Sequence, residues 1–301
     1  MKFQIVSDSS LDLPEETVQK MGIEVVPFYV SFDGSQYFRE GKDIKIQEFY
    51  RHMVEHPDIF PKTSMPSYND YRDVMEKYAA AGQPVLCICL NAIFSGSYQT
   101  AYSVREELLE RYPDTRIEVM DSQLATVLQG LLVEEAVKMR DLDYDLDKTI
   151  SLLEPLRATG QIFFTTNDLA YLRHGGRIGH AASSIGTVLK IKPLIRYKER
   201  DLYSAGLCRG RKHSLEQVLE RMVNYVKEKH LDMSRYHMGI AYGWDEQEFD
   251  PFKEKAFSMM EALGYPRSAW EVSRVGVTIG VHTGPSPIGV GWLKRYTPGK
   301  M

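Results

Sequence analysis

Short apolar runs alternate with helical patterns through the first half of the chain. Four runs predict strands buried on both faces of a parallel sheet, because each is short and bounded by turn residues; they cover residues 3–6, 23–30, 85–90 and 117–120. Between the runs, apolar residues recur at helical spacing, as in 101–108 and 124–132. This alternation predicts a three-layer α/β domain.

The pattern changes after Gly160, where we place a boundary between two domains, residues 1–160 and 161–301. The second part mixes strands with two helical stripes, at 215–226 and 252–263. Strands are expected at residues 162–165, 191–197, 202–205 and 238–242, within the strand-rich stretch 270–281, and at 289–293. The mixture predicts an α+β domain with a mixed or antiparallel sheet.

Composition is that of a soluble globular protein. Of 301 residues, 43% are apolar and 26% are charged, which are ordinary values. The longest apolar run, 85–90, is far shorter than the roughly twenty residues of a membrane-spanning helix, and Asp8 comes too early for a signal peptide. The three cysteines have no metal-binding spacing, so we expect reduced thiols, a cytoplasmic protein, and neither a metal nor another cofactor.

Positive charge is concentrated between residues 171 and 213. This window holds ten Lys or Arg residues against Glu199 and Asp201, whereas the whole chain carries −4. The charge fits a solvated surface, a site for a phosphorylated ligand, or contact with an acidic protein. We do not expect nucleic acid, because the window has no zinc-finger spacing, RNA-binding aromatic run or basic helix.

Ser95, Gly96 and Ser97 follow the buried run 85–90 and begin a predicted helix. Ligands of α/β sheets lie beyond the carboxyl ends of strands, and a helix N-terminus attracts anions. The two hydroxyls can donate hydrogen bonds to an anion, and the glycine allows it to approach the backbone. Simple capping of the helix by a serine explains the same residues.

Polar residues also follow the first strand and precede another helix. Asp8 and Ser9 end the first strand, either as ligand contacts or as turn caps. Residues 67–70 have capping-box spacing, which predicts a helix start. Thr63 and Ser64 lie before that box in a predicted loop, and the cap leaves them unexplained.

Two segments of the second part carry similar candidates. His282 and Thr283 lie where a predicted strand runs out into the turn at 284–285, so His282 is a neutral donor, a base or a surface residue. Arg177 follows the glycines 175–176, which are typical of a helix end. It is expected in a loop between helices, where an arginine suits a phosphate or a carboxylate.

Five segments, in this order along the chain, resemble the DegV family. They are Asp8-Ser9-Ser10-Leu11-Asp12-Leu13-Pro14, Thr63-Ser64-x-Pro66-Ser67, Ser95-Gly96-Ser97-Tyr98-Gln99, Leu172-Arg173-x-Gly175-Gly176-Arg177-Ile178 and His282-Thr283-Gly284-Pro285. The resemblance spans nearly the whole chain. It implies two α/β-type domains with a fatty acid bound between them.

The resemblance further implies a bacterial, non-catalytic protein that binds a long-chain fatty acid and presents it to the catalytic subunit of a fatty acid kinase. The residues that would hold the carboxylate are Thr63, Ser95, Gly96 and His282, with Ser64, Ser97, Thr283, Asp8 and Ser9 as further candidates. Those that would face the kinase are Arg177 and, by a looser match, Arg209 and Arg211. Uncharged donors suffice for the carboxylate, because tail burial contributes about 0.8 kcal/mol per methylene.

Two other functions are consistent with parts of the pattern. Ser95 or Ser97, activated by His282, would make an acyl hydrolase, but the sequence offers no clear acid to orient the histidine. A regulator that binds nucleic acid through the basic window would lose affinity steeply with salt. If the protein binds a fatty acid in this way, we expect that it does not insert stably into a membrane.

Overall fold

The first half of the chain contains a four-stranded parallel sheet. The computed structural model describes residues 2–167, 169–184 and 191–298. Within the parallel sheet the strand order is β2-β1-β6-β7, and Ile5 lies opposite both Ile23 and Leu86. The strands are β1 (Gln4–Asp8), β2 (Ile23–Val26), β6 (Val85–Cys89) and β7 (Ile117–Asp121).

Helices cover both faces of the parallel sheet, which confirms the predicted three-layer arrangement. On one face, buried residues such as Tyr71, Met75 and Leu108 pack against Val6 and Cys87. The helices of this face are α3 (Tyr68–Ala79), which begins with the predicted capping box, and α4 (Ser97–Arg111). Those of the other face are α1 (Glu15–Met21), α5 (Val127–Asp141) and α6 (Leu146–Arg157).

The second half forms a six-stranded mixed sheet, as predicted. Its strand order is β10-β9-β8-β13-β11-β12, in which only β11 and β12 are parallel neighbours. The strands are β8 (Gln161–Thr165), β9 (Ile191–Lys198), β10 (Asp201–Arg209), β11 (Tyr236–Tyr242), β12 (Trp270–Arg274) and β13 (Ile288–Lys294). Two helices cover its outer face, α8 (Arg211–Glu228) and α9 (Glu246–Glu261).

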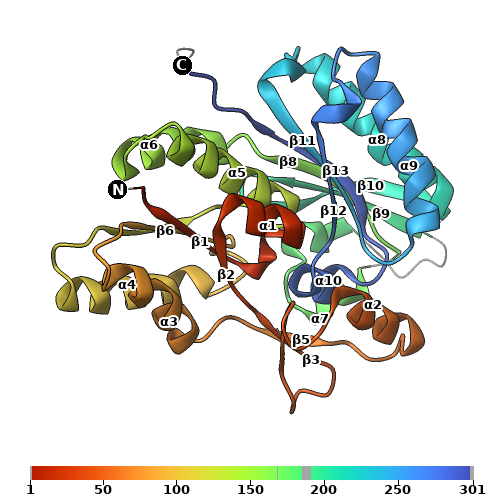
Figure 1. Cartoon of the computed structure of the whole chain (residues 1–301). Coiled ribbons are helices and arrows are strands. Elements are labelled where there is room, and N and C mark those ends of the chain that lie inside the picture. The colour runs from red at the N-terminus through yellow and green to blue at the C-terminus, as the bar shows by residue number, and fades with distance from the viewer. Residues whose placement is uncertain (1, 168, 185–190, 299–301) are drawn as a thin grey trace.

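Helix α5 lies between the two sheets and is buried on almost every side (Figure 1). Its Leu128 and Leu132 share one hydrophobic core with Ile88 of the parallel sheet and with Ile162 and Leu293 of the mixed sheet. Burial on most sides, here including the polar residues Gln129, Glu134 and Glu135, is typical of a helix in such an interior position. The layers therefore run helix, sheet, helix, sheet, helix.

A small antiparallel sheet of strand order β4-β3-β5 extends from the parallel sheet (Figure 1). Its strands are β3 (Tyr29–Ser31), β4 (Phe38–Arg39) and β5 (Lys62–Ser64). Helix α2 (Ile46–Glu55) lies next to this sheet. The single strand predicted over 23–30 is wrong, because Pro27 separates β2 from β3 and the two join different sheets. The loop predicted at Thr63 is also wrong, since Thr63 pairs with Val30 in this sheet.

The strand-rich stretch predicted over 270–281 is wrong in its second half. After β12 the chain forms α10 (Val277–Thr283), so His282 lies in the last turn of a helix and not at the end of a strand. Val277 and Val281 pack on Phe49 and Tyr50 of α2. This burial overrides the strand preference of β-branched residues.

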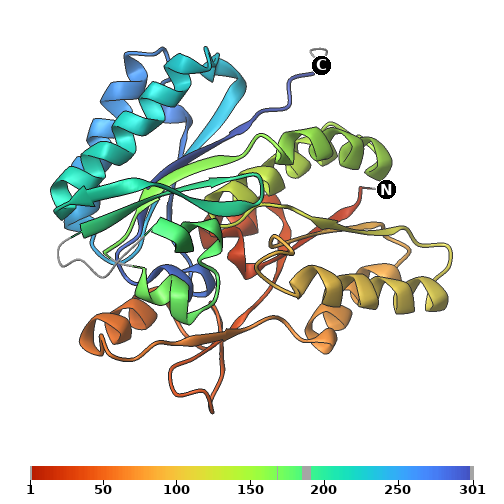
Figure 2. The ribbon, with the colours of Figure 1, turned by 180° about the vertical axis from the view of Figure 1, so that it is seen from behind.

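Helix α7 (Ala170–His174) contacts α10, and the following short turn η2 (Gly179–Ser184) lies beside β10 of the β9–β10 hairpin (Figure 2). The hairpin turns at Glu199 and Arg200, and both residues have positive φ. Other short turns are η1 (Ser9–Leu11), η3 (Met233–Arg235) and η4 (Arg267–Ala269). Within the described ranges, no helix combines the length and the apolar character needed to cross a membrane.

Candidate functional site

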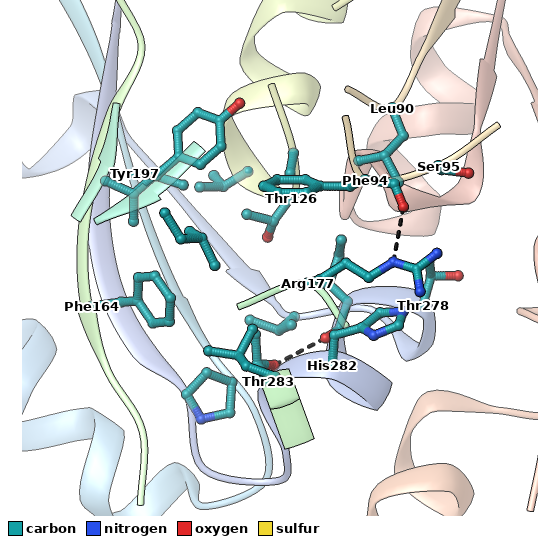
Figure 3. Close-up of a pocket in the computed structure, with 18 of the residues that line it drawn as sticks. Leu90, Phe94, Ser95, Thr126, Phe164, Arg177, Tyr197, Thr278, His282 and Thr283 are labelled. Carbon is teal, nitrogen blue, oxygen red and sulfur yellow. Dashed lines mark hydrogen bonds between the residues drawn. The ribbon is translucent and has the colours of Figure 1, made fainter. Parts of the chain in front are cut away.

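A cavity, called the central cavity from here on, lies between the loops of the parallel sheet and the inner face of the mixed sheet (Figure 3). The parallel sheet contributes Phe28, Leu90 and Phe94 from the loops after β2 and β6. These loops follow the carboxyl ends of strands, where α/β sheets bind ligands. The mixed sheet contributes Ile162 and Phe164 of β8. The cavity encloses about 1130 Å³, including the part open to solvent.

Most of the cavity wall is apolar. Leu172 of α7 and Ile279 of α10 add to the phenylalanines, and Gly289 and Gly291 of β13 face the same space. A Cβ at Gly289 would lie 2.5 Å from the Cβ of Phe164, so only glycine fits there. A long apolar chain is the kind of ligand that such a wall accommodates.

Four polar residues line one end of the cavity, the polar end: Thr63, Ser95, Arg177 and His282. Figure 3 shows Ser95, Arg177 and His282 there. Thr63 comes from β5 and His282 from the last turn of α10, and Thr63 Oγ1 lies 3.1 Å from His282 Nε2. Burial, and then the nearby charge of Arg177, lower the pKa of His282 to about 4. The imidazole is therefore neutral at pH 7.

The proton of the neutral imidazole is assigned to Nε2. Nδ1 of His282 is buried and has no hydrogen-bond partner among the described residues. It faces Gly175, where an added Cβ would lie 2.1 Å away. Because a buried N–H without an acceptor is costly, Nε2–H donates to Thr63 Oγ1. The hydroxyl hydrogen of Thr63 then remains available to a ligand.

Ser95 has the same arrangement at the start of α4. Its Oγ accepts the backbone N–H of Ser97 at 3.1 Å, so its own O–H is left for a ligand. The first turn of α4 adds backbone N–H groups without intrahelical partners and a partial positive charge. Gly96 lies beneath Met65, since a Cβ at Gly96 would come within 2.8 Å of the Met65 sulfur.

Arg177 lies in the loop between α7 and η2, as predicted for a loop between helices. It is exposed, and its Nε donates to the carbonyl oxygen of Phe94 at 3.0 Å. Its Nη1 donates to the carbonyl oxygen of Gly175 at 2.5 Å. These bonds fix the guanidinium at the polar end, beside His282 (Figure 3).

Asp8 and Ser97, which are expected as further contacts of the ligand, lie behind the cavity wall and do not line the cavity. Both are fully buried. A buried carboxylate needs hydrogen-bond donors, and Asp8 accepts from Leu90 N–H at 2.8 Å, Ser97 Oγ at 2.7 Å, Ser10 Oγ at 2.6 Å and Gln129 Nε2 at 2.9 Å. This network holds the loop that carries Ser95.

The remaining serine and threonine candidates have other partners. Ser9 Oγ donates to Glu40 Oε2 at 2.6 Å, away from the polar end. Ser64 is exposed and does not line the cavity. Thr283 does line it, but its hydroxyl donates to the Ile279 carbonyl oxygen within α10, at 3.0 Å.

The two arginines matched more loosely differ in their surroundings. Arg209 is exposed at the end of β10. Arg211 forms an ion pair with Glu248, with Nη2 2.6 Å from Oε2, and also donates to the carbonyl oxygen of Ser286 at 2.8 Å. Arg211 therefore stabilises the start of α8, whereas Arg209 presents its side chain to solvent.

The geometry does not assemble a hydrolase. Ser97 is held by Asp8 and by Tyr71, whose hydroxyl lies 2.5 Å from Ser97 Oγ. The hydrogen-bond partner of His282 is Thr63, and no described carboxylate bonds to Nδ1. A serine nucleophile needs a bonded base and an acid that orients it, and this arrangement has neither.

Two threonines in the cavity wall were not predicted. Thr126 and Thr278 line the cavity, and their hydroxyls donate to the buried carboxyl groups of Asp12 and Glu40, each at 2.6 Å. Thr126 has φ 51° and ψ −138°, a strained conformation for a β-branched residue. No local sequence signal points to either threonine, because their partners lie more than a hundred residues away.

Comparison with known proteins places this geometry in a family. The sequence model of a family described as "Uncharacterised protein, DegV family" matches residues 2–295. A DegV domain-containing protein from Caldanaerobacter subterraneus is 30% identical over 291 residues, which cover 96% of this chain and 98% of that protein.

Solved structures share the whole fold. A stearic-acid-binding protein from Eubacterium ventriosum is 37% identical, with a TM-score of 0.91, over 98% of this chain and 99% of that one. A fatty-acid-binding DegV family protein from Thermus thermophilus is 29% identical, with a TM-score of 0.83, over 98% of this chain and 100% of that one. The agreement extends over both sheets.

Proposed function

The chain belongs to the DegV family, and on that premise we propose that it binds one long-chain fatty acid in the central cavity, with the carboxylate at the polar end. One observation carries this proposal: Thr63, Ser95 and His282 come from three distant segments and meet at one end of a largely apolar cavity. The similar proteins from Eubacterium ventriosum and Thermus thermophilus, described as fatty-acid-binding, support the same ligand class.

The polar end suits a carboxylate that has to stay reactive. Thr63 and Ser95 each accept an N–H bond through oxygen and so turn their hydroxyl hydrogens toward a ligand. Hydrogen bonds of this kind satisfy a carboxylate without the two parallel bonds of an arginine clamp. The ligand oxygens therefore keep lone pairs that can attack a phosphoryl group.

Burial of the tail supplies most of the affinity. Each methylene moved from water into the apolar cavity contributes about 0.8 kcal/mol, which is about fourfold in affinity. A chain of roughly fifteen methylenes thus gains on the order of 12 kcal/mol before the ordering costs of binding. Affinity should rise with chain length until the cavity is filled.

The first experiment is organic extraction of the purified protein followed by mass spectrometry. A co-purified fatty acid in about equimolar amount is the expected result. Binding is then measured with saturated acids of increasing length on delipidated protein. Protein that carries no fatty acid and binds none of the series would contradict the proposal.

We also propose that the bound acid is presented to a fatty acid kinase, which would transfer the γ-phosphoryl group of ATP to a carboxylate oxygen and release ADP. Because ATP is the co-substrate, this role belongs in the cytoplasm. Arg177 beside the polar end and Arg209 at the end of β10 are exposed cations that an acidic protein surface or the ATP phosphates can contact. Arg211 already forms an ion pair with Glu248, so an Arg211 variant serves as the comparison for variants of the two exposed arginines.

The kinase role is tested with a purified fatty acid kinase by following acyl-phosphate formation. Arg177→Ala and Arg209→Ala should slow the reaction while changing fatty acid affinity by less than about fivefold, because an exposed charge contributes at most about 1 kcal/mol. Arg211→Ala should mainly lower stability, since Glu248 loses its partner. Unchanged turnover in both Arg177→Ala and Arg209→Ala would remove these residues from the proposed contact.

A further inference from the structure

We propose that Glu40 is a positioning residue for the carboxylate site: it holds the first turn of α10 in place and thereby fixes His282 at the other end of that helix. The inference rests on the proposed function, because it concerns the affinity of the polar end for a fatty acid carboxylate. Glu40 itself does not line the central cavity.

The contacts of Glu40 join distant parts of the chain. Oε1 accepts the backbone N–H groups of Val277 and Thr278, at the start of α10. Oε2 accepts the hydroxyls of Thr278 and Ser9, each at 2.6 Å. Four donors thus converge on one carboxylate, which also lies at the positive end of the helix dipole. The start of α10 is therefore held by a charged residue that follows β4 in the first half of the chain.

Helix α10 is fastened at both ends by the first half of the chain. Glu40 holds its first turn, and Thr63 bonds to His282 in its last turn. Thr278 and His282 are four residues apart, so they lie on one face, and both line the central cavity. A helix of this length spans about 9 Å as a rigid unit. A shift at its start is passed directly to the imidazole.

The carboxyl group of Asp12 lies near that of Glu40, so the question is which of the two acids carries the negative charge. Gly276, just before α10, is crowded by two carboxyl groups: an added Cβ would lie 2.3 Å from Asp12 Oδ1 and 2.8 Å from Glu40 Oε1. Burial and the neighbouring Glu40 raise the pKa of Asp12 well above its ordinary value. Two carboxyl groups this close do not both ionise readily. Burial raises the pKa of Glu40 as well, but hydrogen bonds from Ser9, Thr278 and Val277 oppose that rise, so we assign the charge to Glu40 and the proton to Asp12.

The test separates positioning from general stability by comparing two ligands with the same tail. Dissociation constants are measured for hexadecanoic acid and for hexadecan-1-ol, which lacks the carboxylate. Glu40→Ala should lower the preference for the acid over the alcohol by about tenfold, the effect of losing one hydrogen bond to a charged group. Glu40→Gln keeps an acceptor oxygen for the two N–H groups and should recover most of that preference.

The matched control is Glu135→Gln. Glu135 is also a buried carboxylate that accepts a backbone N–H, from Tyr296 at 2.9 Å, but it lies outside the cavity wall. This variant should melt at a lower temperature and keep the full preference for the acid. If Glu40→Ala does not fold, Glu40→Asp, which shortens the side chain by one methylene, replaces it and should also reduce the preference.

Equal loss of affinity for the acid and the alcohol in the Glu40 variants would overturn the inference, because it would mean that Glu40 only stabilises the fold. An unchanged ratio in Glu40→Ala or in a folded Glu40→Asp would overturn it as well. If the unmodified protein binds neither ligand, the proposed function itself fails, which is a different result and is seen before any variant is made.

Discussion

The hydroxyls of Thr63 and Ser95 are oriented by the protein before any ligand arrives. Each oxygen already accepts an N–H, from His282 and from Ser97 respectively, which leaves one hydrogen to donate. A hydroxyl that is fixed in this way loses little freedom on binding an anion. Two preorganised hydroxyls can thus hold an anion without the two parallel bonds of an arginine.

Replacing these hydroxyls should lower the affinity for the acid and change the affinity for an uncharged ligand much less. In Thr63→Val and Ser95→Ala the carboxylate loses one hydrogen bond, so the dissociation constant of a long-chain acid should rise about tenfold or more. The constant of the matching alcohol should change much less. Isothermal titration checks both, with the exposed Ser64→Ala as the control. Equal acid affinity in Thr63→Val, Ser95→Ala and Ser64→Ala would argue against the polar end as the carboxylate site.

His282 should make stability depend on pH in acid solution. Its pKa is about 4 in the folded protein, below the ordinary 6.5, so the unfolded chain takes up a proton first. Stability should therefore be unaffected above pH 6.5 and fall as the pH drops from 6.5 towards 4, by about 2 kcal/mol between pH 7 and pH 5. Urea unfolding at both pH values, repeated on His282→Gln, isolates this contribution. A variant with the same pH dependence as the unmodified protein would contradict it.

A residue of the site could be predicted from the sequence where the pattern that indicates it lies in its own segment. Ser95 follows a buried strand and opens a helix, so its place at the sheet edge follows from the chain pattern. Thr63, His282 and Arg177 have weaker signals in their own segments, and only the order of several short motifs predicted that they share one site. Glu40 could not be found in this way, because its function depends on contacts with α10, more than two hundred residues later.

At the scale of elements, α10 is the part that sequence patterns predict least well. Its β-branched residues favour a strand, yet tertiary packing makes the segment a helix. Gly280 allows this, since an added Cβ would lie 2.7 Å from the Tyr50 hydroxyl oxygen and 2.9 Å from a ring carbon of Phe49. The break between β2 and β3, by contrast, is visible at Pro27 in the sequence.

A methyl group at Gly280 should therefore loosen α10. Gly280→Ala should lower the free energy of unfolding by about 1–3 kcal/mol, the range for overpacking in a core. Combined with Tyr50→Phe, which removes the nearest atom, the loss should be smaller than the sum of the single changes. A double-mutant cycle from urea unfolding measures this coupling. Strict additivity would show that the two residues do not crowd each other.

At the scale of the molecule, the predicted fold class is confirmed, but the two halves are not separate in their packing. The division into residues 1–160 and 161–301 remains a prediction, and α5 contributes to a core shared with both sheets. A chain pattern can identify α5 as a buried helix, but it cannot say which two surfaces cover it. That information depends on distant strands.

Because of this shared core, the chain should unfold as one cooperative unit. Denaturation followed by tryptophan fluorescence should coincide with denaturation followed by far-ultraviolet circular dichroism, as expected for a single transition. The tryptophans lie in the second half at positions 244, 270 and 292, whereas the helices that determine the dichroism occur in both halves. Two separated midpoints would mean that the halves unfold independently.

The position of β13 has a consequence for how the protein is made. This strand, near the end of the chain, lies in the middle of the mixed sheet between β8 and β11 and contributes Gly289 and Gly291 to the cavity wall. During translation, β8 and β11 are therefore synthesised before β13, the strand that pairs with both of them. The cavity is therefore completed only when residues 288–294 have been added, so a nascent chain that ends before them cannot hold a ligand there.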